Sequence, residues 1–312
     1  MVAALPLGHL AGPAFAVLDP RFAAAIDPAA AVERLWTGGK WTEGPAWLDR
    51  EGCLIWSDIP GNRLWRWTEM DGAVSVFRDP SHGGNGNTVD REGRLVTCEQ
   101  YTRRITRTEP NGTLTVLVDN VAGRRFNAPN DVVVKSDGSV WFSDPDYGRS
   151  ALYEGERELD GCHVYRFDSA SGEIRQMTDD LVMPNGLAFS ADERLLYIVD
   201  TGSTHVPNGP NHIRRFSVGT DDRLGGGEVF ATNAAEKFDG LRLDTAGRLW
   251  CGAEDGVHCY HPDGTLIGKL LLPERASNLC FGGPDHRTLL ITGTTSIYRC
   301  AVAADGLRLS AA

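Results

Sequence analysis

One short pattern recurs six times along the sequence, and it constrains the fold more than any other feature. In each copy a polar turn is followed by a strand-like run of apolar residues, the local signature of a β-hairpin. Successive copies are separated by 41, 45, 55, 54 and 40 residues. A period of this size, with several strands per repeat, is typical of β-propeller blades. We therefore expect an all-β fold, a six-bladed β-propeller. The turns are anchored at Gly52, Gly93, Gly138, Glu193, Gly247 and Arg287.

The two ends of the chain predict how such a propeller closes. Residues 31–36 form a plausible strand before the first repeat, and residues 295–309 supply its partner after the last. Propellers often close by pairing strands from both chain ends in one blade. No linker or change in composition divides the chain. We expect an N-terminal extension over residues 1–30 and a single propeller domain over residues 31–312.

A polar, oxygen-bearing residue stands eight or nine positions before every anchor. Equivalent positions in successive blades lie on one ring around the propeller axis. Burying six such groups without partners costs a few kcal/mol for each, so a bound cation would satisfy them. The alternative is turn chemistry, because Asn-Gly and Asp-Gly are common turn dipeptides. The six residues are Glu43, Asn85, Asn130, Asn185, Asp239 and Asn278.

The chemistry of this ring points to a hard divalent cation. Its donors are carboxylate and amide oxygens, which suit Ca²⁺, Mg²⁺ or Mn²⁺. The two acids, Glu43 and Asp239, match the charge of one such ion. A cation here can polarise a carbonyl group towards attack by water, and a neighbouring carboxylate can take the proton from that water. Asp239 is the candidate for this base. The sequence thus predicts a central metal site in the channel.

Charge and cysteine content exclude several classes of function. The formal net charge is −11, and the only clustered basic residues are short pairs such as Arg103-Arg104, which argues against nucleic-acid or anionic-membrane partners. No apolar run reaches the length needed to span a bilayer. The seven cysteines lack a C-x-x-C pair, as expected for reduced thiols in a cytoplasmic protein. We expect a monomer or homodimer.

Two of the repeat intervals are about ten residues longer than the others. The extra residues fall at 146–160 and at 201–212, after the second strand of a blade. Long loops in compact domains are often functional, so these insertions act either as a lid over the channel or as ordinary surface loops. His205 and His212 in the second insertion are either catalytic or solvated.

A set of motifs resembles the gluconolactonase family, which includes senescence marker protein (regucalcin) and luciferin-regenerating enzyme. The resemblance extends from about Trp41 to Arg299, and the sequence is most similar to the bacterial sugar-lactonase branch. It implies a six-bladed propeller with one catalytic divalent metal that hydrolyses sugar 1,5- or 1,4-lactones to aldonic acids. The motifs are Trp41-Thr42-Glu43-Gly44-Pro45, Ala128-Pro129-Asn130-Asp131, Trp141-Phe142-Ser143-Asp144-Pro145, Tyr147-Gly148, Met183-Pro184-Asn185-Gly186 and Phe238-Asp239-Gly240.

The resemblance also implies roles for individual residues. Glu43, Asn185 and Asp239 match metal ligands, and Asp239 is also the implied general base. Asn130 matches an asparagine that contacts either metal or substrate. Asn85 and Tyr147 are possible substrate contacts. The implied cofactor is one divalent cation, with Ca²⁺ the first choice and Mg²⁺, Mn²⁺ or Zn²⁺ as substitutes in assays.

Three functions remain open from the sequence. The first is hydrolysis of a gluconolactone-like sugar lactone, with the metal polarising the carbonyl and Asp239 acting as base. The second is a metal-dependent arylesterase or phosphotriesterase-like hydrolase, which needs an electronically similar site. The third is a non-enzymatic propeller that serves as a binding scaffold, because the fold alone does not define an activity.

Overall fold

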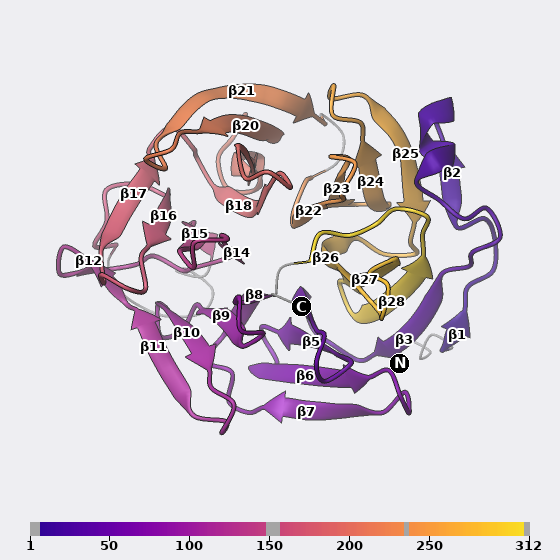
Figure 1. Ribbon diagram of the computed structural model, residues 1–312, viewed down its shortest axis with the longest axis horizontal. Helices are drawn as coiled ribbons and strands as arrows, with labels where there is room; N and C mark the ends of the chain where they lie inside the picture. Colours follow the sequence, from indigo (N-terminus) through magenta and orange to yellow (C-terminus); the bar gives the residue numbers. More distant parts are fainter. Residues whose placement is uncertain (1–6, 148–156, 234–236, 309–312) are drawn as a thin grey trace.

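A computed structural model describes residues 7–147, 157–233 and 237–308. Within these residues, six sheets of four or five strands surround a central channel (Figure 1). The predicted six-bladed β-propeller is therefore confirmed. A small two-stranded ribbon, β12 (Asn120–Val121) and β13 (Arg124–Arg125), accompanies the blades.

Each blade is one antiparallel sheet whose first strand faces the channel. The first blade contains β4 (Thr42–Leu48), β5 (Cys53–Asp58), β6 (Arg63–Thr68) and β7 (Val74–Arg78), and the second contains β8 (Gly84–Val89), β9 (Leu95–Glu99), β10 (Arg104–Thr108) and β11 (Leu114–Val118). The third contains β14 (Val132–Val134), β15 (Val140–Asp144), β16 (His163–Phe167) and β17 (Ile174–Thr178), and the fourth contains β18 (Pro184–Phe189), β19 (Leu195–Asp200), β20 (His212–Val218) and β21 (Leu224–Thr232). The fifth contains β22 (Leu241–Leu243), β23 (Leu249–Ala253), β24 (Gly256–Tyr260) and β25 (Leu266–Leu271), and the sixth contains β26 (Ala276–Gly282), β27 (Thr288–Gly293) and β28 (Ser296–Ala301).

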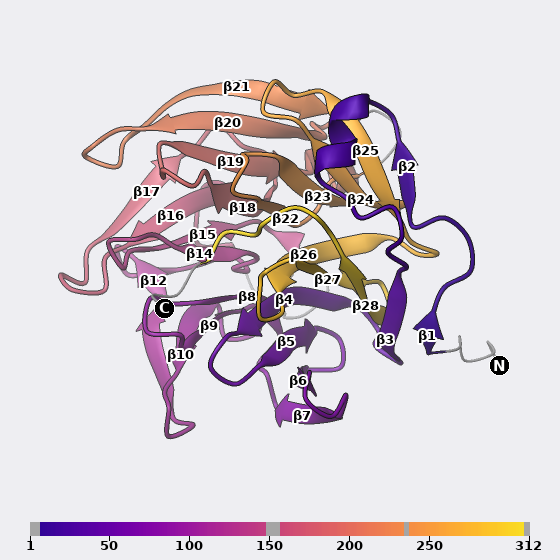
Figure 2. The same ribbon diagram turned by 45° about the vertical axis from the view of Figure 1, so that its right-hand side comes forward.

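The closing blade joins both ends of the chain, as predicted. Strand β3 (Glu33–Thr37) pairs antiparallel with β28, with Trp36 opposite Ile297. It begins and ends slightly later than the predicted residues 31–36. The residues before it extend two blades: β1 (Gly8–His9) pairs with β3, and β2 (Phe15–Val17) pairs with β25. The short 3₁₀ helix η1 (Pro20–Ala24) lies beside β25 in Figure 2.

The first strands of the six blades form a closed ring of contacts. Each contacts the first strand of the blade before it and of the blade after it, so β4, β8, β14, β18, β22 and β26 line the channel together. Strands β4, β8, β18 and β26 are buried over their whole length. A polar residue on these strands is therefore shielded from bulk water.

Glycines in the channel wall allow these strands to approach closely. A Cβ atom on Gly186 would lie 2.6 Å from the backbone oxygen of Asp239, and one on Gly86 would lie 2.5 Å from that of Asn130. Neither glycine has a positive φ angle. Close contact between blades, and not turn geometry, therefore explains these two glycines. Gly44 is different, because it has a φ angle of +52° as well as a close contact.

The hairpin turns that anchor the repeat lie at the predicted positions with one exception. Gly52, Gly93, Gly138, Glu193 and Gly247 all have positive φ angles. In the sixth blade the residue with positive φ is His286, so the predicted anchor at Arg287 was wrong by one position. With His286 as anchor, each ring residue from the second blade onward stands eight positions before its turn.

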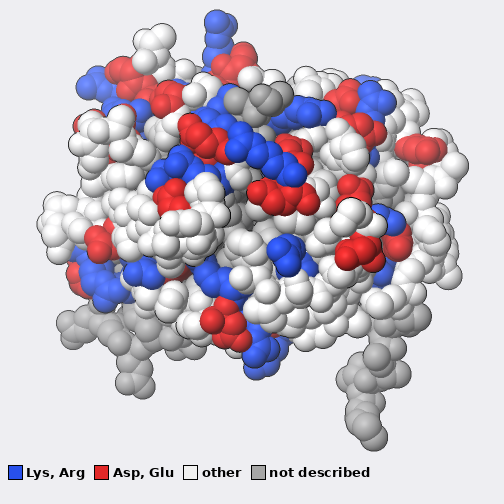
Figure 3. Space-filling model, turned by 60° about the horizontal axis from the view of Figure 1, so that its bottom comes forward, with Lys and Arg blue, Asp and Glu red and all other residues white. Residues whose placement is uncertain are grey.

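The core lies between the blades and is built from their large apolar side chains. Trp141 packs edge-on against Phe189, with ring centroids 5.2 Å apart, and Trp250 packs against Phe281 at 6.2 Å. All seven cysteines are free and buried, as the prediction of reduced thiols required. No helix in the described part of the chain is long and apolar enough to cross a membrane. Figure 3 shows acidic and basic side chains interspersed over one face of the molecule.

Candidate active site

The structure brings the six predicted ring residues to one end of the channel. All six are at least nine-tenths buried. Backbone contacts link neighbours around the ring: Gly86 N donates to Asn130 O at 2.7 Å, and Gly240 N donates to Ser277 O at 2.7 Å. The side chains of Asn185 and Asp239 are hydrogen-bonded, and so are those of Asn278 and Glu43. Residues far apart in the chain therefore form one polar cluster.

The two carboxylates of this cluster are both 5% exposed and lie in each other's electrostatic field. Burial, followed by repulsion from Asp239 and Asp131, raises the pKa of Glu43 well above its usual value, and the donated Gly44 N–H at 3.1 Å opposes this shift. Burial also raises the pKa of Asp239 to about 6, although Arg275 and Asn185 favour its charged form. The folded protein thus places two acids close enough to interact in a largely desolvated site.

A divalent cation fits this donor set. The Glu43 carboxylate contacts a backbone N–H and an amide, and it lies in the field of two acids, Asp239 and Asp131, and of one cation, Arg275. Hard cations prefer such oxygen donors. No group of three or more His, Cys, Asp or Glu with metal-binding spacing occurs among the described residues. A site here would therefore depend on amide oxygens from Asn130 and Asn185 in addition to the two acids.

The remaining amides of the ring have backbone roles as well. The backbone oxygen of Asn85 accepts from Ser57 Oγ at 2.6 Å, and Asn278 Oδ1 accepts from Leu279 N at 2.8 Å. The backbone nitrogen of Asn130 donates to Ser143 O at 2.9 Å. These bonds fix the main chain at the ring.

Three aspartates that the sequence analysis did not single out as site residues hold the segments leading into the ring. Asp58, Asp144 and Asp200 each stand at the end of the second strand of a blade, and each accepts the N–H groups of two consecutive residues from the segment before a first strand. These donors lie two and three residues before a ring residue. A sequence signal existed, because each aspartate follows its ring residue by 14 or 15 positions. The donors are Lys40 and Trp41 for Asp58, Asn127 and Ala128 for Asp144, and Val182 and Met183 for Asp200.

The two insertions meet above the ring. Tyr147, from the first insertion, donates to Met183 O at 3.3 Å, and its ring lies 5.1 Å from that of His205 in the second. Burial raises the pKa of Tyr147, which keeps its hydroxyl protonated. Residues 148–156 of the first insertion lie outside the described residues. His212 lies in β20, with its Nε2 atom 4.0 Å from the Asp200 carboxylate.

One further residue of the site, Arg275, does not belong to the repeated pattern of the sequence. Arg275, just before β26, donates from Nη2 to Asp239 Oδ2 at 2.9 Å, and its guanidinium lies 5.5 Å from the centre of the Trp41 ring. Its Nη1 atom lies 3.5 Å from Glu254 Oε1. A single charged residue before a strand is common in sequences, so nothing distinguished Arg275 before the structure was known.

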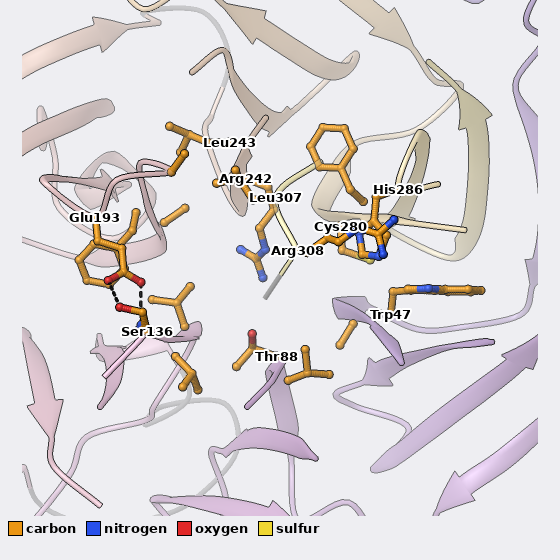
Figure 4. A pocket seen from close by; sticks show the side chains of 18 of the residues that line it. Trp47, Thr88, Ser136, Glu193, Arg242, Leu243, Cys280, His286, Leu307 and Arg308 are labelled. Carbon is orange, nitrogen blue, oxygen red and sulfur yellow. Dashed lines mark hydrogen bonds between the residues drawn. The ribbon is translucent and has the colours of Figure 1, made fainter. Parts of the chain in front are cut away.

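A separate cavity of about 390 Å³ opens at the opposite end of the channel. It is lined by residues further along the same inner strands, including Trp47, Thr88 and Cys280 (Figure 4). Arg242 also lines it and pairs with the buried Asp131 at 3.3 Å. Because Asp131 in turn acts electrostatically on Glu43 and Asp239, this ion pair stands between the cavity and the ring. The cavity is therefore distinct from the candidate active site.

Comparison with known proteins identifies the family. The family described as SMP-30/Gluconolactonase/LRE-like region matches residues 41–295. The chain is 31% identical to a gluconolactonase of Zymomonas mobilis, over 90% of this chain and 84% of that protein. A solved gluconolactonase structure from Xanthomonas campestris is 35% identical with a TM-score of 0.88, covering 96% of this chain and 98% of that one. The chain belongs to the SMP-30/gluconolactonase/LRE-like family, which confirms the resemblance predicted from the motifs.

A more distant neighbour shares the fold. The structure of a calcium-binding regucalcin from Agrobacterium tumefaciens has a TM-score of 0.72 at 21% identity, and the match covers 88% of this chain and 94% of that one. At this level of identity the likeness concerns the propeller architecture alone.

Proposed function

We propose that this protein is a metal-dependent lactonase that hydrolyses a gluconolactone-like sugar lactone to the aldonic acid. The observation that carries the proposal is the pair of buried acids, Glu43 and Asp239, gathered with amide side chains at one end of the channel. The relatives support the substrate class, because the similar proteins from Zymomonas mobilis and Xanthomonas campestris are gluconolactonases.

The cation would be held by Glu43, Asn130, Asn185 and Asp239, and when bound it would polarise the lactone carbonyl. Ca²⁺ is the first choice, because all the proposed ligands are oxygen donors, which suit a hard cation. The hydrogen bonds that Asn185 makes to Asp239 and that Asn278 makes to Glu43 preorganise the donors.

Asp239 is the general base of the proposed reaction. Its carboxylate takes a proton from water as the water oxygen bonds to the carbonyl carbon of the lactone. The bond between that carbon and the ring oxygen then breaks, and the ring oxygen receives the proton as a hydroxyl. The product is the open-chain aldonic acid, which ionises at neutral pH. A bound cation would favour the charged form of Asp239, which is the form that a general base needs.

The hydroxyl groups of the sugar would meet polar side chains at the same end of the channel. Asn85 and Asn130 offer amides from the second and third blades, and Tyr147 offers a protonated hydroxyl from the first insertion. Hydrogen bonds of this kind discriminate strongly against substrates that lack the matching group. Tyr147 and His205 bring aromatic rings from the two insertions to within 5.1 Å of each other.

The test is hydrolysis of glucono-δ-lactone and xylonolactone, followed by acid release with a pH indicator. We expect activity that EDTA abolishes and Ca²⁺ restores. Asp239→Asn and Glu43→Gln should each lower kcat/KM by at least a hundredfold, whereas the exposed control Glu51→Gln should not change it. Full activity in EDTA, or in Asp239→Ala, would refute the mechanism. Preference for aryl esters or phosphotriesters would assign the site to the alternative hydrolase class.

A further inference from the structure

Arg275 is hydrogen-bonded to a carboxylate oxygen that the proposed metal site would use as a ligand. The Nη2 atom of this residue donates to Asp239 Oδ2 at 2.9 Å, and its charge also acts on Glu43. Of the basic residues described near the ring, Arg242 pairs instead with Asp131, on the side of the other cavity. Arg275 is therefore the group that compensates the negative charge of the ring when no metal ion does so.

The contacts of Arg275 allow a second position for its guanidinium. The Nη1 atom already lies 3.5 Å from Glu254, a side chain that is 45% exposed at the rim. The guanidinium carbon lies 5.5 Å from the centre of the Trp41 ring, and such a cation–π contact does not depend on which carboxylate is bound. In addition, Nε is buried and has no hydrogen-bond partner among the described residues. The bond to Asp239 thus leaves the guanidinium incompletely satisfied.

We propose that Arg275 is an internal counter-ion of the metal site, which a divalent cation displaces from Asp239 towards Glu254 while Trp41 supports the guanidinium. The inference rests on the proposed function, because it assumes that a cation binds Asp239. Arg275 is a positioning residue in this scheme: it holds the Asp239 carboxylate in place before the metal arrives and weakens metal binding by competing for it. The affinity for metal is then set partly by a residue that is not a ligand.

The experiment measures the affinity of the EDTA-treated protein for Ca²⁺, and separately for Mn²⁺, by isothermal titration calorimetry. Arg275→Met removes the competing cation and should tighten binding by roughly tenfold or more. Arg275→Lys keeps the charge and should bind metal nearly as the wild type does. The matched control is Arg299→Met, because Arg299 also stacks on a tryptophan and pairs with a carboxylate, far from the ring on the closing blade.

A double-mutant cycle tests the second position. Glu254→Gln removes the alternative partner, keeps Arg275 on Asp239 and should weaken metal binding several-fold. In the Arg275→Met background the same change should have a much smaller effect, because no guanidinium remains to be redirected. An equal effect in both backgrounds would mean that Glu254 acts only through its own charge, and this would overturn the displacement.

The outcomes separate this inference from the proposed function. If the wild type binds metal and Arg275→Met binds it equally or more weakly, the counter-ion role is wrong and the metal site stands. If neither protein binds Ca²⁺ or Mn²⁺, both the metal site and the displacement are refuted. Thermal unfolding in EDTA checks the fold of every variant. A folded Arg275→Met protein should show a larger metal-induced rise in Tm than the wild type.

Discussion

The pair of buried acids implies that the site lowers the stability of the metal-free protein, and Glu43→Gln tests this directly. Gln has nearly the same volume as Glu, and its carbonyl oxygen can still accept the Gly44 N–H. The substitution removes a buried negative charge that two acids, Asp239 and Asp131, repel and that Arg275, which is paired with Asp239, compensates only in part. We therefore expect the variant to be more stable than the wild type in EDTA at pH 8, although it should be inactive.

The magnitude follows from two opposing contributions. Burying a carboxylate costs several kcal/mol even after the protein relaxes. Its hydrogen bonds to Gly44 N and Asn278 recover part of this, at about 1.5–3 kcal/mol for a bond to a charged group. A net gain of about 2 kcal/mol in the free energy of unfolding is expected for the variant. For a chain of this length, that corresponds to a rise in Tm of about 3 °C.

The pH dependence gives the prediction its sign. The folded-state pKa of Glu43 is raised, so between its usual value and the folded value the folded protein holds this proton more tightly than the unfolded chain. The wild type therefore loses stability as the pH rises through this window. Glu43→Gln cannot lose that proton, so its advantage should be smallest near pH 4 and should grow towards pH 8.

The assay is thermal or urea unfolding in EDTA at pH 4, 6 and 8, with and without excess Ca²⁺. Wild type should gain stability from Ca²⁺, and Glu43→Gln should gain little or none. Glu51→Gln serves as control, because this exposed glutamate lies in the turn that follows β4. A variant that is less stable than wild type in EDTA at pH 8 would refute the argument that the Glu43 charge is incompletely compensated in the metal-free protein.

Three more predictions concern the frame of the site. Gly186→Ala should lower the free energy of unfolding, measured in urea, by about 3 kcal/mol or more, because the new Cβ atom would overlap the backbone of Asp239. The control Gly138→Ala should cost only about 1–2 kcal/mol, because its Cβ atom would lie in open space. In Asp200→Asn the side chain has one carbonyl oxygen and can no longer accept both the Val182 and Met183 N–H groups, so we expect Tm to fall by about 3 °C and kcat/KM to fall with it. An unchanged kcat/KM would show that this segment does not need the support of Asp200. Almost no cysteine thiol of the native protein should react with Ellman's reagent at pH 8, because every cysteine is buried, whereas all seven should react in guanidinium chloride.

Much of the architecture was predictable because the repeat is a local signal. The hairpin turns and the six blades follow from a pattern that recurs every 40–55 residues, and the closing strand follows from strand-like runs at both ends of the chain. The error at Arg287 has a physical reason: the sixth turn has no glycine at its anchor, and His286 adopts the positive φ angle instead. A search for glycine or for turn composition alone cannot place such a residue.

The site was only partly predictable, because some of its residues recur at equivalent positions in the repeats and others do not. The ring residues share a phase with the turns, so their meeting at one end of the channel could be expected. Asp58 and Asp200 also recur at a regular distance from their ring residues. Their function is to accept hydrogen bonds from backbone N–H groups, and such contacts cannot be predicted from the sequence. Arg275 does not recur at an equivalent position in the other repeats. Its place beside Asp239 depends on how the fifth and sixth blades pack.

These features together explain how a propeller can hold two buried acids in one polar cluster without losing its fold. The cost of the buried charges is concentrated at Glu43 and Asp239, while the segments that carry the ring are fixed by aspartate–backbone bonds and by glycine contacts between blades. The frame therefore does not depend on metal, and only the side chains of the ring gain from it. Removal of the cation should accordingly abolish activity and lower Tm while leaving the far-ultraviolet circular dichroism spectrum of the sheets unchanged. Loss of β-structure in EDTA would show instead that the ring is part of the folding core.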